Sequence, residues 1–487
     1  MHAVIVETTS GKLRGIEEQT YYKFLGIPYA KPPVGELRFK PPQALERWEG
    51  IKECTGCGPA APQLRYKELK VLDEDAVIDE DCLYLNVYTP AIDEKKRPIL
   101  VYIHGGAFQR GSGNLHFNPQ TYLEQDVVIV NLNFRIGAFG FLDMSAWLGD
   151  EYRQSGNSGL LDVVMALKWL RVNAGVFGGD PDNITIMGQS SVAKMVASLL
   201  VMETAKGNFD KAIICSGGVQ CIRDHATATR VAEPFMDALG LSAENAQELL
   251  TLPWQKIVEA QSALFSGLNL HTVGPVFDGI NFSGSNALDI IRSGKAGNIP
   301  VLIGTNRDEM QLFCNAYRFY DLDESMARQL FADNAPIVLR EFAKRVPRDE
   351  HLAANTVDFL TEYIYRDGVV KLCDAFTEAG NRNVYLFRND FDQQPMRAAH
   401  ATEEQFTMRN YGAAAEKSDA YYGLADGVVE SISIFLRTGA PASAALPAWP
   451  SYADGGKMLV WDLRSHVEAS APSYVAPDMP EQVYIRK

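Results

Sequence analysis

The chain has 487 residues, of which 46% are hydrophobic and 22% charged, and its net charge at pH 7 is −15. This negative charge argues against nucleic acid or an anionic membrane surface as a partner. No apolar stretch approaches the length that a membrane-spanning helix requires, and no Pro-, Ser- or Gly-rich linker or repeat divides the chain. We therefore expect a single domain, residues 1–487, with an extensive core.

The first residues, 2–9, alternate as in a strand, without the basic and apolar segments of a secretion signal. The seven cysteines, an odd number, then indicate reduced thiols. Cys54 and Cys57 have the spacing of half a zinc site, but no second pair follows, so we expect a loop there and no metal. These features predict a cytoplasmic protein.

An apolar run at 98–103 predicts a buried strand, and it ends in the sequence HGGAF at 104–108. Small residues directly after a strand let backbone N–H groups converge on one point, as a carbonyl oxygen requires when it becomes tetrahedral. We expect Gly106 and Ala107 to be two donors of such an oxyanion hole. A simple glycine turn is the alternative interpretation.

Short apolar runs and helical segments alternate along the rest of the chain. Apolar runs bounded by turn residues suit strands that are buried on both faces, whereas residues 160–173 have helical spacing. This alternation predicts an α/β fold with a mostly parallel central sheet flanked by helices, and with catalytic groups at the carboxyl ends of the strands. The expected strands are 127–132, 184–187, 211–215 and 301–304.

Residues 185–192, TIMGQSSV, predict a strand that enters a tight turn and presents a serine. The turn matches the G-x-S-x-G nucleophile elbow except at Val192, which stands where the second glycine belongs. Small residues are normal there because the following helix passes close to the strand. We expect Ser190 to be the nucleophile, Ser191 to supply a third oxyanion N–H, and the valine to shift the helix outward.

These motifs resemble those of type B carboxylesterases, the cholinesterase-like branch of the α/β-hydrolases, and most closely bacterial para-nitrobenzyl esterases. The resemblance extends nearly from end to end. It implies an α/β-hydrolase fold with helical insertions that rim an active-site gorge, with residues 64–79 at the rim. It also implies serine esterase activity without a cofactor or metal. The matching segments are 24–30, 32–35, 37–39, 80–87, 133–135, 140–142, 156–162 and 177–183.

A serine nucleophile needs a base and an acid that orients it, and in this class both follow the serine along the chain. The resemblance selects His400, which small residues flank and which Glu403 follows. It also selects Glu309 as the acid, although the local sequence leaves the adjacent Asp308 open because both can reach the same loop edge. The histidines available as the base are His271, His351, His400 and His466.

Several residues near this site depart from the family pattern. Gln189 replaces a glutamate, which removes a negative charge near the base and makes a cationic substrate less favoured. Together with the lack of evidence for an aromatic choline cage, this argues against a cholinesterase. Ser216 matches a serine that supports the acid and the base, although a plain turn at a strand end would look the same.

The sequence thus predicts a carboxylic ester hydrolase that acts on small to medium apolar esters through Ser190, His400, Glu309 and an acyl-enzyme intermediate. One alternative is a catalytically impaired binding protein of the same family. Another is a hydrolase of an amide, carbamate or lactone. The candidate walls of the substrate pocket, which could equally belong to the core, are Phe108, Leu115, Phe117 and Phe277.

Overall fold

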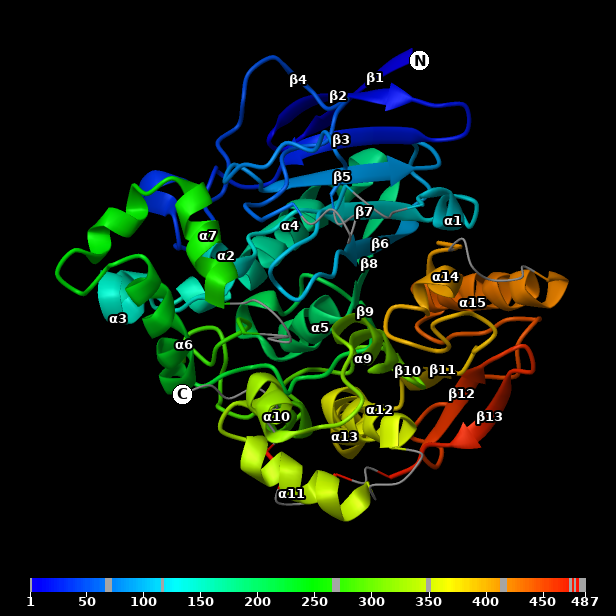
Figure 1. Cartoon of the computed structure of the whole chain (residues 1–487). Coiled ribbons are helices and arrows are strands. Elements are labelled where there is room, and N and C mark those ends of the chain that lie inside the picture. Colours follow the sequence, from blue (N-terminus) through cyan, green and yellow to red (C-terminus); the bar gives the residue numbers. More distant parts are fainter. Residues whose placement is uncertain are drawn as a thin grey trace.

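The structure is a computed structural model that describes residues 2–65, 72–114, 118–264, 272–346, 352–411, 418–472, 475–476 and 479–480. Within these residues one 13-stranded sheet has the order β1-β2-β3-β5-β7-β6-β8-β9-β10-β11-β12-β13, with β4 paired to β2. The sheet crosses the centre of the molecule (Figure 1). The strands are β1 (His2–Thr8), β2 (Gly11–Glu17), β3 (Tyr22–Pro28), β4 (Ile51–Glu53), β5 (Tyr84–Thr89), β6 (Arg97–Ile103), β7 (Val128–Leu132), β8 (Gly179–Gln189), β9 (Lys211–Cys215), β10 (Val301–Asn306), β11 (Val384–Asn389), β12 (Lys457–Trp461) and β13 (His466–Ala469).

Helices cover the sheet and form insertions between its strands (Figure 1). One π-helical turn, Glu362–Arg366, joins α12 to α13. The α-helices are α1 (Gln120–Leu123), α2 (Gly137–Phe141), α3 (Ser145–Leu148), α4 (Ser158–Asn173), α5 (Ser191–Val201), α6 (His225–Ala238), α7 (Trp254–Leu264), α8 (Ala287–Arg292), α9 (Gln311–Tyr317), α10 (Glu324–Phe331), α11 (Ala335–Arg345), α12 (Leu352–Thr361), α13 (Asp367–Glu378), α14 (Glu404–Thr407) and α15 (Asp419–Thr438).

The middle of the sheet is parallel, and its two margins are antiparallel apart from the parallel pair of β2 and β4. A parallel ladder runs from β7 through β6, β8, β9, β10 and β11 to β12. Parallel neighbours need a crossover connection, and α4, α5, α13 and α15 lie in the connections that lead to β8, β9, β11 and β12. The mostly parallel α/β sheet predicted from the sequence is therefore confirmed.

The central strand β6 is buried along its whole length, which explains its continuous apolar sequence. Ile99, Val101 and Ile103 belong to the core that contains α4 and α5, whereas Leu100 and Tyr102 belong to the core that contains α15. Alternate residues of a strand point to opposite faces, so each face of the sheet has its own core. A third core unites α9, α10, α11 and α12, the insertion between β10 and β11.

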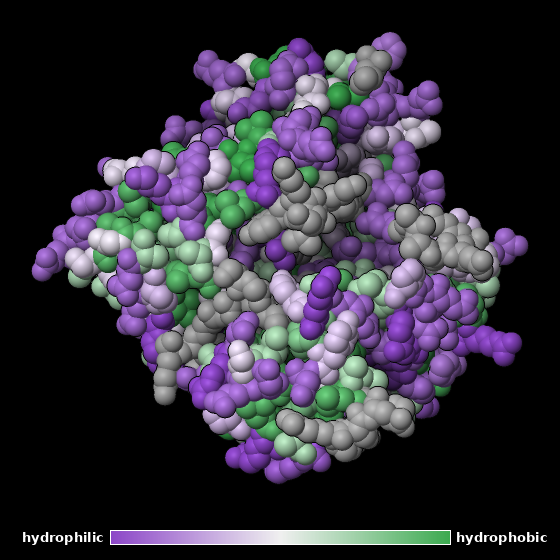
Figure 2. Space-filling model, viewed as in Figure 1, coloured by the Kyte–Doolittle hydropathy of each residue, from purple (hydrophilic) through white to green (hydrophobic). Residues whose placement is uncertain are grey.

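Hydrophilic residues cover most of the face seen in Figure 1, with hydrophobic residues interspersed (Figure 2). Among the residues that the structure describes, no helix is both long enough and apolar enough to cross a bilayer. All seven cysteines are described and none forms a disulfide. Burial raises the pKa of the thiols of Cys82, Cys215 and Cys373, which makes these cysteines poor nucleophiles.

A buried ion pair joins the loop after β7 to helix α4. Arg135 Nη2 lies 2.7 Å from Asp162 Oδ1 and Arg135 Nε lies 2.8 Å from Oδ2, with side-chain exposures of 2% and 0%. Loss of one partner would leave a buried charge uncompensated, so we expect Asp162→Asn to lower the free energy of unfolding by about 3–5 kcal/mol. Denaturant-induced unfolding measures this loss.

The matched control is Asp289→Asn, which breaks the exposed pair between Arg292 and Asp289, where the side chains are 40% and 69% exposed. Solvent screens an exposed pair, so this change should cost less than about 1 kcal/mol. Equal losses in the two variants would show that the pair at Arg135 is not the source of the stability.

Candidate active site

The turn between β8 and α5 presents Ser190 at the carboxyl end of its strand. Ser190 has φ +63° and ψ −125°, a backbone conformation that residues other than glycine rarely adopt. Two backbone hydrogen bonds hold it there: Ser190 N–H donates to Cys215 O at 2.9 Å, and Lys194 N–H donates to Ser190 O at 3.2 Å. The turn therefore has the geometry that the sequence predicts for a nucleophile elbow.

Val192 packs directly against the strand that precedes the turn. It is 1% exposed, and a Cβ added to Gly188 would lie 2.6 Å from its carbonyl oxygen and 2.8 Å from its Cγ1. The valine thus occupies the space that the absent side chain of Gly188 leaves. With the valine in this position, Ser190 Oγ still lies 2.7 Å from His400 Nε2.

A continuous hydrogen-bond chain links Ser190, His400 and Glu309. The hydroxyl of Ser190 lies 2.7 Å from His400 Nε2, and His400 Nδ1 lies 2.5 Å from Glu309 Oε2. His400 is 6% exposed and Glu309 is fully buried. With the proton on Nδ1, the imidazole donates to the carboxylate and its Nε2 can accept the proton of the serine.

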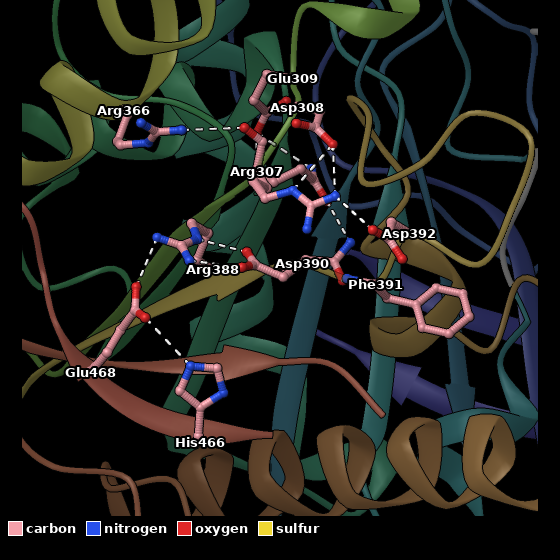
Figure 3. Close-up of polar contacts among 12 residues, drawn as sticks. Arg307, Asp308, Glu309, Arg366, Arg388, Asp390, Phe391, Asp392, His466 and Glu468 are labelled. Carbon is pink, nitrogen blue, oxygen red and sulfur yellow. Dashed lines mark hydrogen bonds and ion pairs between the residues drawn. The ribbon is translucent and has the colours of Figure 1, made fainter. Parts of the chain in front are cut away.

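The other acidic candidate, Asp308, lies in a separate polar network. Its Oδ2 is 3.1 Å from Arg307 Nη2 and 3.4 Å from Arg397 Nη2. Figure 3 shows Arg307 between Asp308 and Asp392, on the loops that follow β10 and β11. The structure therefore brings Glu309, rather than Asp308, to the imidazole.

The glycine-rich loop after β6 lies against the serine. Gly106 and Ala107 have φ angles of +126° and +58°, so the backbone turns sharply here. A Cβ added to Gly105 would lie only 3.8 Å from the Cβ of Ser190. The hydroxyl of Ser191 accepts the N–H of the next loop residue, Phe108, at 3.2 Å and so ties the loop to α5.

A model of the carboxylesterase family matches residues 2–474. The chain belongs to the carboxylesterase family. The carboxylesterase is 34% identical over 478 residues to the para-nitrobenzyl esterase of Bacillus subtilis (strain 168), with 92% of each chain covered. It is 32% identical over 489 residues to the phenmedipham hydrolase of Pseudarthrobacter oxydans, with 94% of each chain covered.

Solved structures agree with this assignment. A Geobacillus stearothermophilus carboxylesterase matches with a TM-score of 0.84 and 34% identity, over 95% of this chain and 97% of the other. A PNB esterase matches with a TM-score of 0.82 and 31% identity, over the same shares. The predicted α/β-hydrolase fold and the predicted family are therefore confirmed, and the carboxylesterase is a serine hydrolase of carboxylic esters.

Behind the imidazole, the carboxylesterase places a second buried acid. Glu309 Oε1 accepts hydrogen bonds from Ser216 Oγ at 2.6 Å and from the Asn306 N–H at 2.7 Å. The side-chain amide of Asn306 donates from Nδ2 to Glu403 Oε2 at 2.5 Å. Burial and then the Glu309 carboxylate raise the pKa of Glu403, which favours a single negative charge on the two acids. The sequence indicated Ser216 and Glu403, but Asn306 was missed although it ends the strand before Glu309.

Two aromatic rings flank the imidazole, and no sequence motif indicated either of them. The rings of Tyr365 and Phe313 have centroids 4.9 Å and 5.2 Å from that of His400. Tyr365 lies on the π-helical turn, a feature that often marks functional sites. Gln189 Nε2 approaches His400 Nε2 at 3.4 Å, so a neutral amide lies beside the imidazole.

The two expected pocket residues that the structure describes, Phe108 and Phe277, differ in burial. Phe108 is 1% exposed and packs on Phe141 at 4.7 Å between ring centroids, as a core residue does. Phe277 is partly buried, and its ring lies 5.4 Å from that of Phe282. Outside the described residues lie Leu115, Phe117, the histidines His271 and His351, and part of the expected gorge rim, 66–71.

His104 precedes the glycine-rich loop and makes stability depend on pH. Its ring stacks on Phe134 at 4.8 Å, and its Nδ1 lies 2.9 Å from Gly105 O. Burial lowers the pKa of His104 from 6.5 to about 4. Between these values the unfolded chain binds the proton and the folded chain does not, so the contribution of His104 to stability falls as pH decreases from 6.5 towards 4.

We expect His104→Gln to remove this dependence. The free energy of unfolding of the wild type, minus that of the variant, should decrease by about 2 kcal/mol between pH 7.5 and pH 5. Denaturant titrations of both proteins at the two pH values measure the difference. A difference that stays constant with pH would mean that His104 has the same pKa in the folded and the unfolded chain.

Proposed function

We propose that the carboxylesterase hydrolyses small to medium esters by two-step acyl transfer, with Ser190 as nucleophile, His400 as base and Glu309 as the orienting acid. The observation that supports this most directly is the unbroken hydrogen-bond chain from the serine hydroxyl to the buried carboxylate. We also propose that residues 1–487 form one domain and that the reaction requires neither a cofactor nor a metal.

In the first step, His400 Nε2 accepts the proton as Ser190 Oγ attacks the ester carbonyl. The negative charge that develops on the carbonyl oxygen is stabilised by the N–H groups of Gly106, Ala107 and Ser191. Glu309 stays ionised and stabilises the imidazolium. Collapse of the tetrahedral intermediate expels the alcohol, which takes the proton from His400.

In the second step, water repeats the attack on the acyl-enzyme. His400 removes a proton from the water, the same three N–H groups hold the oxyanion, and Ser190 leaves with the proton. The raised pKa of Glu403 favours its neutral form, which suits both steps, because a second negative charge would compete with Glu309 for the imidazolium.

Covalent labelling combined with turnover tests this function. Wild-type protein should hydrolyse 4-nitrophenyl butyrate, and a fluorophosphonate should label one serine, located by peptide mass spectrometry at Ser190. Labelling of Ser191 would move the nucleophile by one position. Absence of both labelling and turnover over several acyl lengths, amides, carbamates and lactones included, would favour the binding-protein alternative.

A further inference from the structure

The imidazole of His400 is bound at both of its nitrogens, but one of these bonds is lost during the proposed reaction. Its Nδ1 lies 2.5 Å from Glu309 Oε2 and its Nε2 lies 2.7 Å from Ser190 Oγ. Once Ser190 is acylated, its oxygen has no proton to donate, so only the bond to Glu309 remains. Contacts on the ring itself then decide whether Nε2 stays in place, and a misplacement of about 1 Å can cost about 100-fold in rate.

Tyr365 makes such a contact, and its side chain is only 1% exposed. The centroids of the Tyr365 and His400 rings are 4.9 Å apart and the ring planes are tilted by 40°, a separation typical of attractive aromatic pairs. The ammonium of Lys194 lies over the same tyrosine ring, 5.4 Å from its centroid. Lys194 belongs to α5, the helix that begins directly after Ser190. The tyrosine ring thus connects the helix of the nucleophile with the base.

The backbone around Tyr365 is anchored on both sides. It forms the π-helical turn between α12 and α13, and such turns are rare and occur frequently at functional sites. Gln220 Nε2 donates to Ile364 O at 3.0 Å, which ties the turn to the loop after β9. Arg366 Nη2 donates to Arg307 O at 3.2 Å, on the loop after β10 (Figure 3). The turn is therefore fixed to two of the loops that build the site.

We propose that Tyr365 is a positioning residue, whose ring holds the imidazole of His400 so that Nε2 faces the reacting oxygen in both acyl-transfer steps. The inference rests on the proposed function, because it concerns the base of the same reaction. Tyr365 itself transfers no proton. The role belongs to the aromatic ring, because the ring makes the contacts with His400 and Lys194.

Two butyrate esters with different leaving groups test this role. Nitrophenolate leaves 4-nitrophenyl butyrate as a stable anion, whereas the ethoxide of ethyl butyrate takes a proton from His400 Nε2 as it leaves. In Tyr365→Leu the imidazole is held less firmly, so kcat/KM should fall for both esters, and further for ethyl butyrate. The ratio of kcat/KM, 4-nitrophenyl over ethyl, should rise by about tenfold or more, a share of the ~10²–10⁴-fold that a positioned acid or base contributes.

Three further variants separate the ring from the rest of the turn. Tyr365→Phe keeps the ring and should keep the wild-type ratio. Tyr363→Leu is the matched control, because Tyr363 lies on the same turn and is 2% exposed, but its ring packs on Phe331 at 5.5 Å between centroids. This control loses the same atoms and should leave the ratio unchanged. Circular dichroism and thermal melting establish folding, and Tyr365→Met replaces a leucine variant that does not fold.

A second measurement requires no turnover. The proton between His400 Nδ1 and Glu309 Oε2 should give a downfield signal in the proton NMR spectrum, because the two atoms are 2.5 Å apart. This signal should be present in the wild type and in Tyr365→Phe. It should be broadened or lost in Tyr365→Leu, where the imidazole moves more freely.

The outcomes separate this proposal from the proposed function. If the ratio in Tyr365→Leu equals that of the wild type, or rises as much in Tyr363→Leu or Tyr365→Phe, the ring does not position the base, while the esterase function stands. If the wild type hydrolyses neither ester, the proposed function fails and the proton signal decides the role of Tyr365. Equal signals in the wild type and Tyr365→Leu then refute that role, and a signal lost only with the ring supports it.

Discussion

Replacement of Ser190 by alanine is expected to lower kcat by about 10⁵–10⁶-fold, the size of loss seen when a triad nucleophile is removed. The variant keeps the backbone N–H groups around the site, so the residual rate reflects oxyanion stabilisation and binding alone. Steady-state hydrolysis of 4-nitrophenyl butyrate measures the loss, and the initial burst of 4-nitrophenol should disappear with it.

Ser191→Ala is the matched control, because it removes a hydroxyl from the adjacent residue. That hydroxyl is fully buried and accepts the N–H of Phe108 at 3.2 Å, so it points towards the glycine-rich loop. Its loss should lower kcat by no more than about tenfold, the cost of one neutral hydrogen bond. If Ser191→Ala were as damaging as Ser190→Ala, the assignment of the nucleophile would be wrong.

Replacement of Glu309 by glutamine is the second large effect, with an expected loss in kcat of about 10⁴-fold. The side-chain amide of glutamine can donate to Nδ1 of His400, which would place the imidazole proton on Nε2. In that tautomer Nε2 cannot accept the proton of Ser190. Contacts from Ser216 and Asn306 hold the side chain at position 309, so the loss would come from the tautomer rather than from displacement.

Asp308→Asn provides the comparison for Glu309→Gln. Asp308 is paired with Arg307 (Figure 3) and also with Arg397, and its side chain is 15% exposed. Its neutralisation should change kcat by less than about tenfold, because it weakens partly exposed ion pairs without altering the imidazole. If Asp308→Asn lowered kcat more than Glu309→Gln did, Asp308 would be the acid.

The strands of the sheet centre could be predicted from the sequence, but not all of their ends could: the predicted strand 211–215 has the bounds of β9, whereas others differ. The predicted strand 184–187 lies within β8, which extends from Gly179 to Gln189. The additional residues include polar ones, such as Asp180 and Asp182, that periodicity assigns to a loop. Apolar periodicity reports which side chains are buried, whereas the length of a strand depends on backbone pairing with its neighbours.

The sequence by itself determined the parts of the site that local constraints encode. The turn at Ser190 and the glycine-rich loop at Gly106 need small residues and sharp turns within a few positions, and such patterns are visible in a linear sequence. The α/β fold was visible for the same reason, because strands buried on both faces and amphipathic helices have distinct periodicities.

Only the tertiary structure decided which distant side chains meet. It selected Glu309 over Asp308, because two neighbouring residues on one loop point to different partners. It also brought Tyr365 and Phe313 to His400, from elements far apart along the chain. Such contacts depend on the packing of helices and loops onto the sheet, which neither periodicity nor a local motif encodes.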